Sequence, residues 1–183
     1  RHWDAQEQVQ IIEPQIHPVE GPLRMGEVVR RVSELTHDTA VMCTDVGQNQ
    51  MMAARYFRFT QPRSVATSGG MGTMGYGLPA AIGAAYGAPE RTVCVFMGDG
   101  GLQMVIQEFG TIMEYGIPVK MILLDNHYLG NVRQWQELFF NGRYSFTPMT
   151  NPDFLKIAEA YNIPARRVSE RRHLDGAIQE MLA

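Results

Sequence analysis

The sequence has few cysteines, no long apolar run and no excess of basic charge. Its two cysteines, Cys43 and Cys94, lie far apart in apolar stretches, which indicates buried thiols in a reducing, cytoplasmic setting and no disulfide framework or zinc knuckle. No apolar segment approaches the roughly 20 residues of a membrane span, so we expect no membrane partner. Sixteen Lys and Arg against nineteen Asp and Glu give a net charge of −3, which argues against nucleic acid as a partner.

The composition is that of a globular chain with one compact core. Of its 183 residues, 45% are hydrophobic, 19% charged and 9% aromatic, values that exclude disorder, collagen and coiled coil. Residues 1–24 contain three prolines and no sustained periodicity, so we expect an extended lead-in or linker there and a domain over residues 25–183. Because the chain begins with Arg1, we expect it to be a piece of a larger subunit. A basic cluster near the end, residues 166–173, is expected to be solvated.

Short apolar runs alternate with helical patterns along the rest of the chain. This alternation predicts right-handed crossovers, a mainly parallel sheet and a three-layer α/β/α fold. The predicted strands are residues 40–44, 64–68, 92–97, 119–124 and 165–168. The predicted helices are residues 25–37, 77–86, 102–115, 129–140, 151–161, where Asn151 is the expected N-cap, and 170–182.

Ligands of such sheets bind beyond the carboxyl ends of the strands, and two oxygen-bearing side chains follow neighbouring predicted strands. Asp99 follows the third strand inside a Gly-Asp-Gly turn, and Asn126 follows the fourth. A carboxylate, an amide oxygen, a backbone carbonyl and two diphosphate oxygens form an all-oxygen set that suits Mg²⁺. Glycines on both sides of Asp99 let the backbone approach a phosphate group.

With Asp99 and Asn126 in place, two longer segments carry a family resemblance. Residues 67–83, TSGGMGTMGYGLPAAIG, and residues 128–136, YLGNVRQWQ, resemble the large catalytic subunit of acetolactate synthase (acetohydroxyacid synthase). The resemblance covers about residues 25–182 and corresponds to the carboxy-terminal, thiamine diphosphate-binding part of that subunit. It implies the thiamine diphosphate-binding fold, with a final strand missing after residue 183.

The resemblance also implies the residues of the site. It assigns Mg²⁺ to Asp99, Asn126 and the backbone carbonyl of Tyr128, and it assigns Val132 and Trp135 to the substrate. Met74 would be the apolar wedge that keeps the cofactor bent. The positions implied for binding thiamine diphosphate are Gly47, Gln48, Asn49, Gly72, Met74, Gly100, Gly101, Asn126, Tyr128, Leu129, Gly130 and Asn131.

Three positions depart from the family pattern. Asp125-Asn126 stands where Asn-Asn is usual, although the retained Asn126 is the implied ligand. Asn49 replaces a common histidine and still donates to phosphate without carrying charge. Asn131 replaces a methionine beside the substrate, which leaves the preference for 2-oxobutanoate over pyruvate open.

The implied reaction is decarboxylation of pyruvate on thiamine diphosphate and addition of the hydroxyethyl unit to a second pyruvate or 2-oxobutanoate, in branched-chain amino-acid biosynthesis. The full-length enzyme is expected to be a homodimer or homotetramer that holds FAD mainly outside this chain, with a small regulatory subunit as a further expected partner. A catalytic glutamate would come from another domain of the partner subunit, so no catalytic residue is assigned here. The 183 residues alone are expected to bind cofactor weakly and to turn over nothing.

Three alternatives stay open at this point. Gly70-x-Gly72-x-x-Gly75 matches a nicotinamide fingerprint, although the acidic residue expected about 20 positions later is absent, since Val95 stands there. A different thiamine diphosphate-dependent 2-oxo acid enzyme, an oxidase, decarboxylase or carboligase, would keep the same site. A non-enzymatic phosphate-binding or assembly module would keep the fold without the chemistry.

Overall fold

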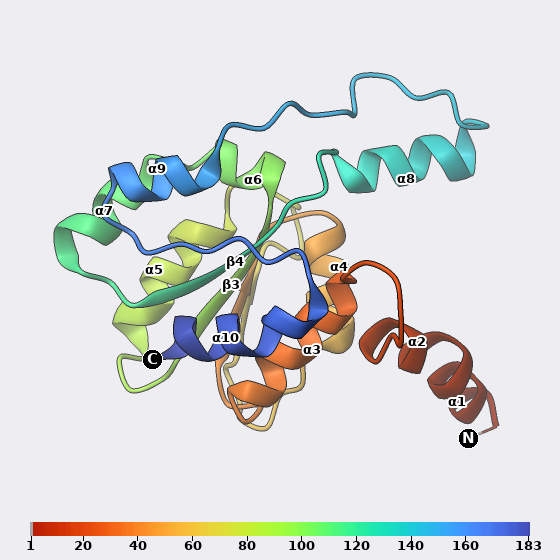
Figure 1. Ribbon diagram of the computed structural model, residues 1–183, viewed down its shortest axis with the longest axis horizontal. Coiled ribbons are helices and arrows are strands. Elements are labelled where there is room, and N and C mark those ends of the chain that lie inside the picture. Colours follow the sequence, from red (N-terminus) through yellow and green to blue (C-terminus); the bar gives the residue numbers. More distant parts are fainter. Residues whose placement is uncertain (1) are drawn as a thin grey trace.

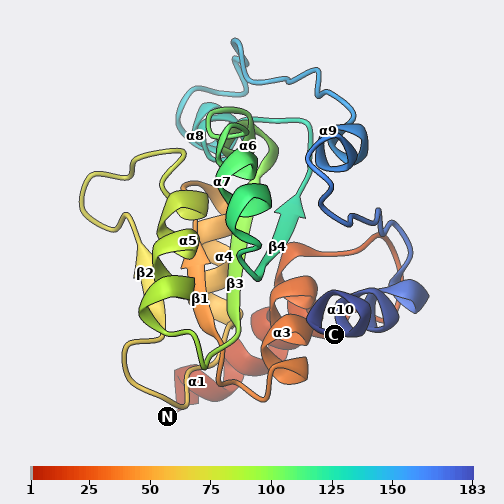
Figure 2. The ribbon, with the colours of Figure 1, turned by 90° about the vertical axis from the view of Figure 1, so that its left-hand side faces the viewer.

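The structure, a computed structural model that describes residues 2–183, contains a parallel sheet of four strands in the order β2-β1-β3-β4 (Figure 2). The strands are β1 (Val41–Thr44), β2 (Val65–Thr67), β3 (Val93–Gly98) and β4 (Val119–Leu124). Four of the five predicted strands are therefore confirmed. Each is a short run rich in apolar and β-branched residues; the central strands β1 and β3 are buried on both faces, and β2 is a largely exposed edge strand.

Alternate residues of the central strands face two separate cores. Met42, Cys94 and Phe96 belong to the core beneath α3 (Met25–Leu35), α4 (Gln48–Tyr56) and α10 (Leu174–Leu182). Val41, Cys43 and Val95 belong to the core on the other face. That second core also receives side chains of α5 (Gly77–Gly87), α6 (Asp99–Gln103), α7 (Glu108–Tyr115) and α9 (Phe154–Ala160). The period-2 alternation thus produces the predicted three-layer arrangement.

Both cysteines are buried and free, as predicted. Burial raises the pKa of Cys43 and of Cys94 to about 12, so these thiols are unreactive packing groups. Among the described helices, none combines the length and the apolarity that a membrane span requires.

The amino-terminal segment is helical, so the prediction of an extended lead-in is wrong in its secondary structure. It forms α1 (His2–Glu7), a π-helical turn η1 (Gln8–Ile12) and α2 (Glu13–Ile16), and it lies beside α3 and α4 (Figure 1). Ile16 is buried in the core beneath α3, and Arg55 of α4 forms an ion pair with Glu7. These tertiary contacts stabilise a helix that the local sequence does not indicate.

The carboxy-terminal part departs from the prediction in two places. Residues 165–168 form no strand, because Arg166 and Arg167 are exposed and Val168 alone packs on the core. The predicted helix 170–182 begins instead with a 3₁₀ turn, η2 (Arg171–His173), before α10. Arg171 of the basic cluster is not simply solvated, since it forms an ion pair with the buried Glu27.

The predicted helix over residues 102–115 is broken into α6 and α7. The break occurs where the amides of Met104 and Val105 bond to carbonyls three residues earlier, which tightens the turn. Val105 is buried there against Gly75, whose close approach holds the bend. Helix α4 was not predicted at all. Helix α8 (Gly130–Phe139) was, and it extends away from the three layers (Figure 1).

Asp175→Asn should lower the free energy of unfolding by about 0.5–1 kcal/mol at neutral pH, because the carboxylate holds Arg31 across the α3–α10 contact through two hydrogen bonds of 2.9 and 2.8 Å. Arg31 lowers the pKa of Asp175, so this contribution is present above the ordinary carboxyl pKa and is lost as the pH falls through the native value. Urea titrations at neutral and strongly acid pH measure it. Glu180→Gln, which removes the more exposed pair with Arg166, is the control and should change less. An effect of Asp175→Asn that is equal at both pH values would contradict the assignment.

Candidate functional site

A topological switch point lies between β1 and β3. After β1 the chain adds β2 on one side, and it later returns to place β3 on the other side (Figure 2). The segments that leave the carboxyl ends of these two strands therefore run in opposite directions, and in sheets of this kind the ligand crevice lies where they part. Asp45 and Gly47 follow β1 at this point, and Asp99 follows β3.

Asp99 is the first residue of α6 and is 1% exposed. Its carboxylate accepts hydrogen bonds from the Gly100 amide at 3.1 Å and from Asn151 Nδ2 at 2.7 Å. Burial raises the pKa of Asp99, and the neighbouring Asp125 raises it further, while the two amide donors act in the opposite direction. A cation beside this buried carboxylate would stabilise its ionised form.

The pairing of β3 with β4 sets Asp99 beside the residues that follow β4. Gly98 pairs with Leu124, so Asp99 and Asp125 occupy equivalent positions just beyond the two strands. Asn151 Nδ2 joins them, donating to Asp125 at 2.8 Å as well as to Asp99. One ligating atom each of Asp99, Asp125 and His127 lies within 4.8 Å of the others, which is a spacing that a metal ion can bridge.

Asn126 points toward a different set of partners in this structure. Its Oδ1 accepts from the Tyr128 amide at 3.1 Å, and its Nδ2 donates to Gln48 Oε1 at 3.3 Å. Gln48 in turn donates to Gln134 at 3.2 Å. In the described residues no direct hydrogen bond joins Asn126 to Asp99, so the two predicted ligands lie at neighbouring strand ends and are held by separate partners.

Gly100 lies at the centre of a second group of predicted residues. A Cβ atom at Gly100 would lie 3.0 Å from Leu129 Cδ2 and 3.5 Å from Met74 Cε. It would also lie 3.2 Å from Met149 Sδ, a residue that the sequence had not indicated. These three side chains therefore pack so closely on the Gly100 backbone that a Cβ would crowd them.

The residues after β1 meet the start of α8. A Cβ at Gly47 would lie 3.7 Å from Asn49 Nδ2 and 4.0 Å from the Cβ of Asn131. Position 130 requires glycine, because a Cβ there would collide with Gln48 Oε1. Gly47 has a φ of 120°, a conformation that favours glycine. The structure therefore brings these five predicted residues together.

The remaining predicted residues divide between the crevice and the surface. Gly101 packs on Asp45, and Gly72, with a φ of 62°, lies in the loop before α5 near Val46. Val132 and Trp135 are 45% and 55% exposed on α8, so the structure does not bring them into the cluster.

A segment that we call the strap, residues 144–151, covers the loop after β4. Tyr128 pairs with Pro148, the Leu129 amide donates to Thr147 at 2.9 Å, and the Met149 amide donates to His127 at 2.8 Å. Arg133 lies between two tyrosine rings, 4.3 Å from that of Tyr128 and 4.0 Å from that of Tyr144. The strap thus fixes the backbone around Tyr128.

Asn151 closes the strap, and it is not the N-cap that the sequence predicted. Its Nδ2 contacts Asp99 and Asp125, and its Oδ1 accepts from Gln103 Nε2 at 3.0 Å. Asp153 caps α9 instead, accepting from the amides of residues 155 and 156. An Asn-Pro pair is equally compatible with an asparagine that caps the following helix and with one that bonds to residues at the ends of other strands. The sequence alone therefore could not distinguish these two roles.

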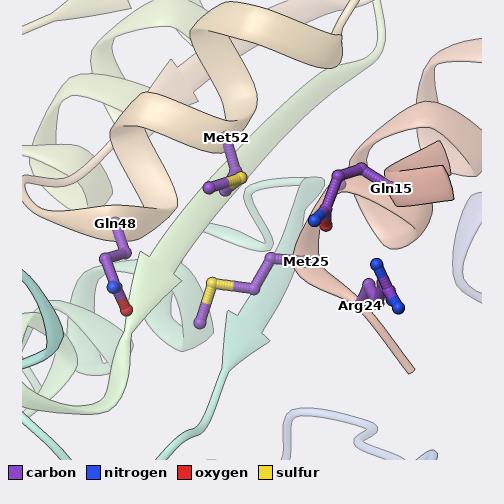
Figure 3. A pocket seen from close by; sticks show the side chains of 6 residues that line it. Gln15, Arg24, Met25, Gln48 and Met52 are labelled. Carbon is purple, nitrogen blue, oxygen red and sulfur yellow. The ribbon is translucent and has the colours of Figure 1, made fainter. Parts of the chain in front are cut away.

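A pocket of about 370 Å³ adjoins Gln48. Figure 3 shows Met25 and Met52 between Gln48 on one side and Gln15 with Arg24 on the other. The wall of this pocket is built in part by residues before α3. The amino-terminal helical segment therefore contributes to the surroundings of Gln48.

Comparison with known proteins identifies the domain. The model of the family described as "Thiamine pyrophosphate enzyme, C-terminal TPP binding domain" matches residues 45–183. The chain belongs to this family. The matched range begins directly after β1 and includes β3, β4 and the strap.

Individual relatives of this thiamine pyrophosphate enzyme domain agree with the assignment. The chain is 46% identical over 161 residues to an acetolactate synthase large subunit of Haemophilus influenzae, covering 87% of this chain and 28% of that one. It is 45% identical over 162 residues to acetolactate synthase 2 of Nicotiana tabacum, covering 84% and 24%. The chain thus spans about a quarter of the length of these relatives. A benzoylformate decarboxylase structure from Polynucleobacter necessarius superposes with a TM-score of 0.80 at 26% identity, covering 89% of this chain and 31% of that one.

Gly77→Ala in this thiamine pyrophosphate enzyme domain should lower the free energy of unfolding by about 1–3 kcal/mol, the cost of overpacking. The added Cβ would lie 2.7 Å from the Asp45 backbone nitrogen, which is fixed in the sheet and cannot move aside. Gly83→Ala, on the same helix with nothing within 4 Å, is the matched control and should gain about 0.5–1 kcal/mol. Thermal or urea unfolding measures both. Equal stability of the two variants would show that the crevice is not tightly packed at Gly77.

Arg133→Lys should loosen the strap, because lysine keeps the charge and loses the planar stack between the two tyrosines. We expect the amides of Leu129 and Met149 to exchange hydrogen about 2- to 30-fold faster, the range that cation–π energies imply. Arg143→Lys is the control, since Arg143 bonds to the Phe140 carbonyl nearby and takes no part in the stack. Unchanged protection of both amides in Arg133→Lys would mean that the stack does not hold the strap.

Proposed function

We propose that the chain is the carboxy-terminal, thiamine diphosphate-binding domain of an acetolactate synthase catalytic subunit, with residues 25–183 as the domain itself. That enzyme decarboxylates pyruvate and transfers the two-carbon unit to a second pyruvate or to 2-oxobutanoate. The observation that carries the proposal is the meeting of a buried carboxylate, amide side chains and closely packed glycines at the ends of β1, β3 and β4. Identity of about 45% to acetolactate synthase subunits supports the choice of reaction.

The residues present fit a diphosphate held through a divalent cation. Gly100 keeps the turn after β3 free of a side chain, and Leu129, Met149 and Met74 pack closely on its backbone. Asn49 carries a buried Oδ1 with no partner in the described residues, and its Nδ2, the group that can donate to a phosphate oxygen, lies 3.1 Å from the Val46 carbonyl. Asp99 supplies a buried anionic oxygen, and its neighbours at the end of β4 supply amide and carbonyl oxygens, the ligand type that Mg²⁺ prefers.

Within the proposal, three oxygens hold Mg²⁺: the Asp99 carboxylate, the Asn126 amide oxygen and the Tyr128 carbonyl. Turning Asn126 from its hydrogen bond with the Tyr128 amide would release that oxygen for the metal. Gly72 and Met74 contact the aminopyrimidine, with Met74 as the apolar wedge. The residues assigned to the diphosphate are Gly47, Gln48, Asn49, Gly100, Gly101, Leu129, Gly130 and Asn131.

The thiazolium of the cofactor supplies the carbon nucleophile and the electron sink for decarboxylation. The chain supplies position and surroundings. Met74, which lies beside Gly100, would exclude water from the space between residues 72–77 and residues 99–101. The strap holds the loop after β4 through backbone hydrogen bonds. Such fixed geometry raises the effective concentration of groups that must meet.

Substrate and partners belong to the whole enzyme in this proposal. Val132 and Trp135 on α8 would face the second 2-oxo acid, where an aromatic ring adds about 1–3 kcal/mol per methylene of a larger acceptor. The exposed apolar side chains of α8 would then be covered by other parts of the subunit or by a second copy. FAD, a homodimer or homotetramer, a small regulatory subunit and a cytoplasmic location complete the proposal.

A decarboxylase or oxidase that uses the same cofactor is the second candidate, because a benzoylformate decarboxylase shares the fold at a TM-score of 0.80. The nicotinamide alternative has no such support. Gly70 and Gly72 lie in an exposed loop, and α5 begins five residues after Gly72, so the glycines do not open a helix as that fingerprint requires.

Asp99→Ala in the full-length subunit should weaken thiamine diphosphate binding at least about tenfold in the presence of Mg²⁺, since a charge-assisted metal contact is lost. Calorimetry with and without Mg²⁺ measures this. Asp153→Ala, which removes the cap of α9 outside the crevice, is the control and should bind normally. Product analysis with pyruvate then separates the candidates, because 2-acetolactate supports the proposal while acetaldehyde or an oxidised product supports the alternative. Unchanged cofactor affinity in Asp99→Ala would instead favour an assembly module.

A further inference from the structure

Asp45 is a buried carboxylate to which the sequence assigned no role. It follows β1 directly, it is 0% exposed, and its amide donates to the Phe96 carbonyl of β3 at 2.9 Å. Its backbone is therefore fixed to both strands of the switch point. From this place its side chain reaches the two segments that leave the crevice.

One carboxylate oxygen holds the loop that carries Gly72 and Met74. Asp45 Oδ1 accepts from the Gly75 amide at 2.7 Å and from the Gly77 amide at 3.3 Å. Gly77 begins α5, whose own N-cap residue makes no side-chain cap bond, so Asp45 satisfies amides that the helix start leaves free. This loop is thereby tied to the end of β1.

The other oxygen lies against the turn after β3. A Cβ at Gly101 would lie 2.8 Å from Asp45 Cγ and would collide with Oδ2, so the carboxylate occupies the space of a side chain at that position. Oδ2 has no hydrogen-bond partner in the described residues. An unpaired buried oxygen costs free energy. A serine or threonine would cap the helix without this cost, so capping alone does not explain an aspartate at position 45.

We propose that Asp45 is a positioning residue that sets the separation between the pyrimidine loop, residues 72–77, and the diphosphate turn, residues 99–101. The proposal rests on the proposed function, because these two segments are where the two ends of thiamine diphosphate would bind. One oxygen fixes the loop by hydrogen bonds, and the other acts as a spacer against Gly101. A ligand that spans both segments needs that separation, whereas a ligand of one segment does not.

This difference gives the test, which compares a ligand of both segments with a ligand of one. In the full-length subunit with saturating Mg²⁺, the dissociation constant of thiamine diphosphate is measured by quenching of tryptophan fluorescence, and that of inorganic diphosphate by competition. Asp45→Ala should raise the first constant about tenfold or more and the second by less than about threefold. Asp45→Asn keeps the size and an acceptor oxygen, and it should restore the wild-type ratio. Cys43→Ala is the matched control, since it opens a cavity in β1 two residues away without touching either segment.

An equal loss of affinity for both ligands in Asp45→Ala would overturn the proposal, as would the same change of ratio in Cys43→Ala. If Asp45→Ala does not fold, Asp45→Ser takes its place, because its shorter side chain cannot reach both the Gly75 amide and Gly101. Faster hydrogen exchange at Gly75 and Gly77 in either variant without cofactor would support the tie to the loop. Wild-type protein that binds no thiamine diphosphate would refute the proposed function itself, whereas wild-type binding with an unchanged ratio in the variants would refute the role of Asp45 alone.

Discussion

The hydrogen-bonded contact between β1 and β3 determines where everything else in the crevice lies. Parallel strands lie about 4.8 Å apart, so residues that leave their carboxyl ends are neighbours whatever their separation in sequence. Asp45 and Asp99 are brought together in this way, and the pairing of Gly98 with Leu124 adds the residues after β4. Because the switch point divides the departing segments, these polar groups gather at the edge of the sheet where ligands of such folds bind.

The sequence predicted those parts of the fold that follow from local patterns. The strands are short apolar runs separated by helices, and this alternation predicts a parallel sheet. The alternate residues of the central strands do face two helical layers. The place of the site followed from the sheet, since Asp99 and Asn126 come directly after two strands. The prediction of a strand over residues 165–168 was wrong, because a short run with apolar ends around two arginines resembles an edge strand in sequence. In the structure these residues form no strand.

What the sequence did not predict depends on contacts between distant segments. The helical start of the chain is stabilised by Ile16 in the core and by the pair of Arg55 with Glu7, neither of which has a local signature. Asn151 and Arg133 contact residues distant in sequence, so their roles become evident only from the folded position of the strap. Asp45 is different, since its place directly after a predicted strand was a signal that could have identified it.

The two buried carboxylates of the crevice reduce the stability of the isolated domain. Burial raises the pKa of both Asp45 and Asp99, which means that each costs free energy when ionised at neutral pH. A cation would offset the cost at Asp99, where oxygen ligands gather. Among the described residues no basic side chain bonds to Asp45, and the amides of Gly75 and Gly77 stabilise one of its oxygens. The buried Asp45 carboxylate is therefore better explained by the spacing that it imposes on residues 72–77 and residues 99–101 than by its charge.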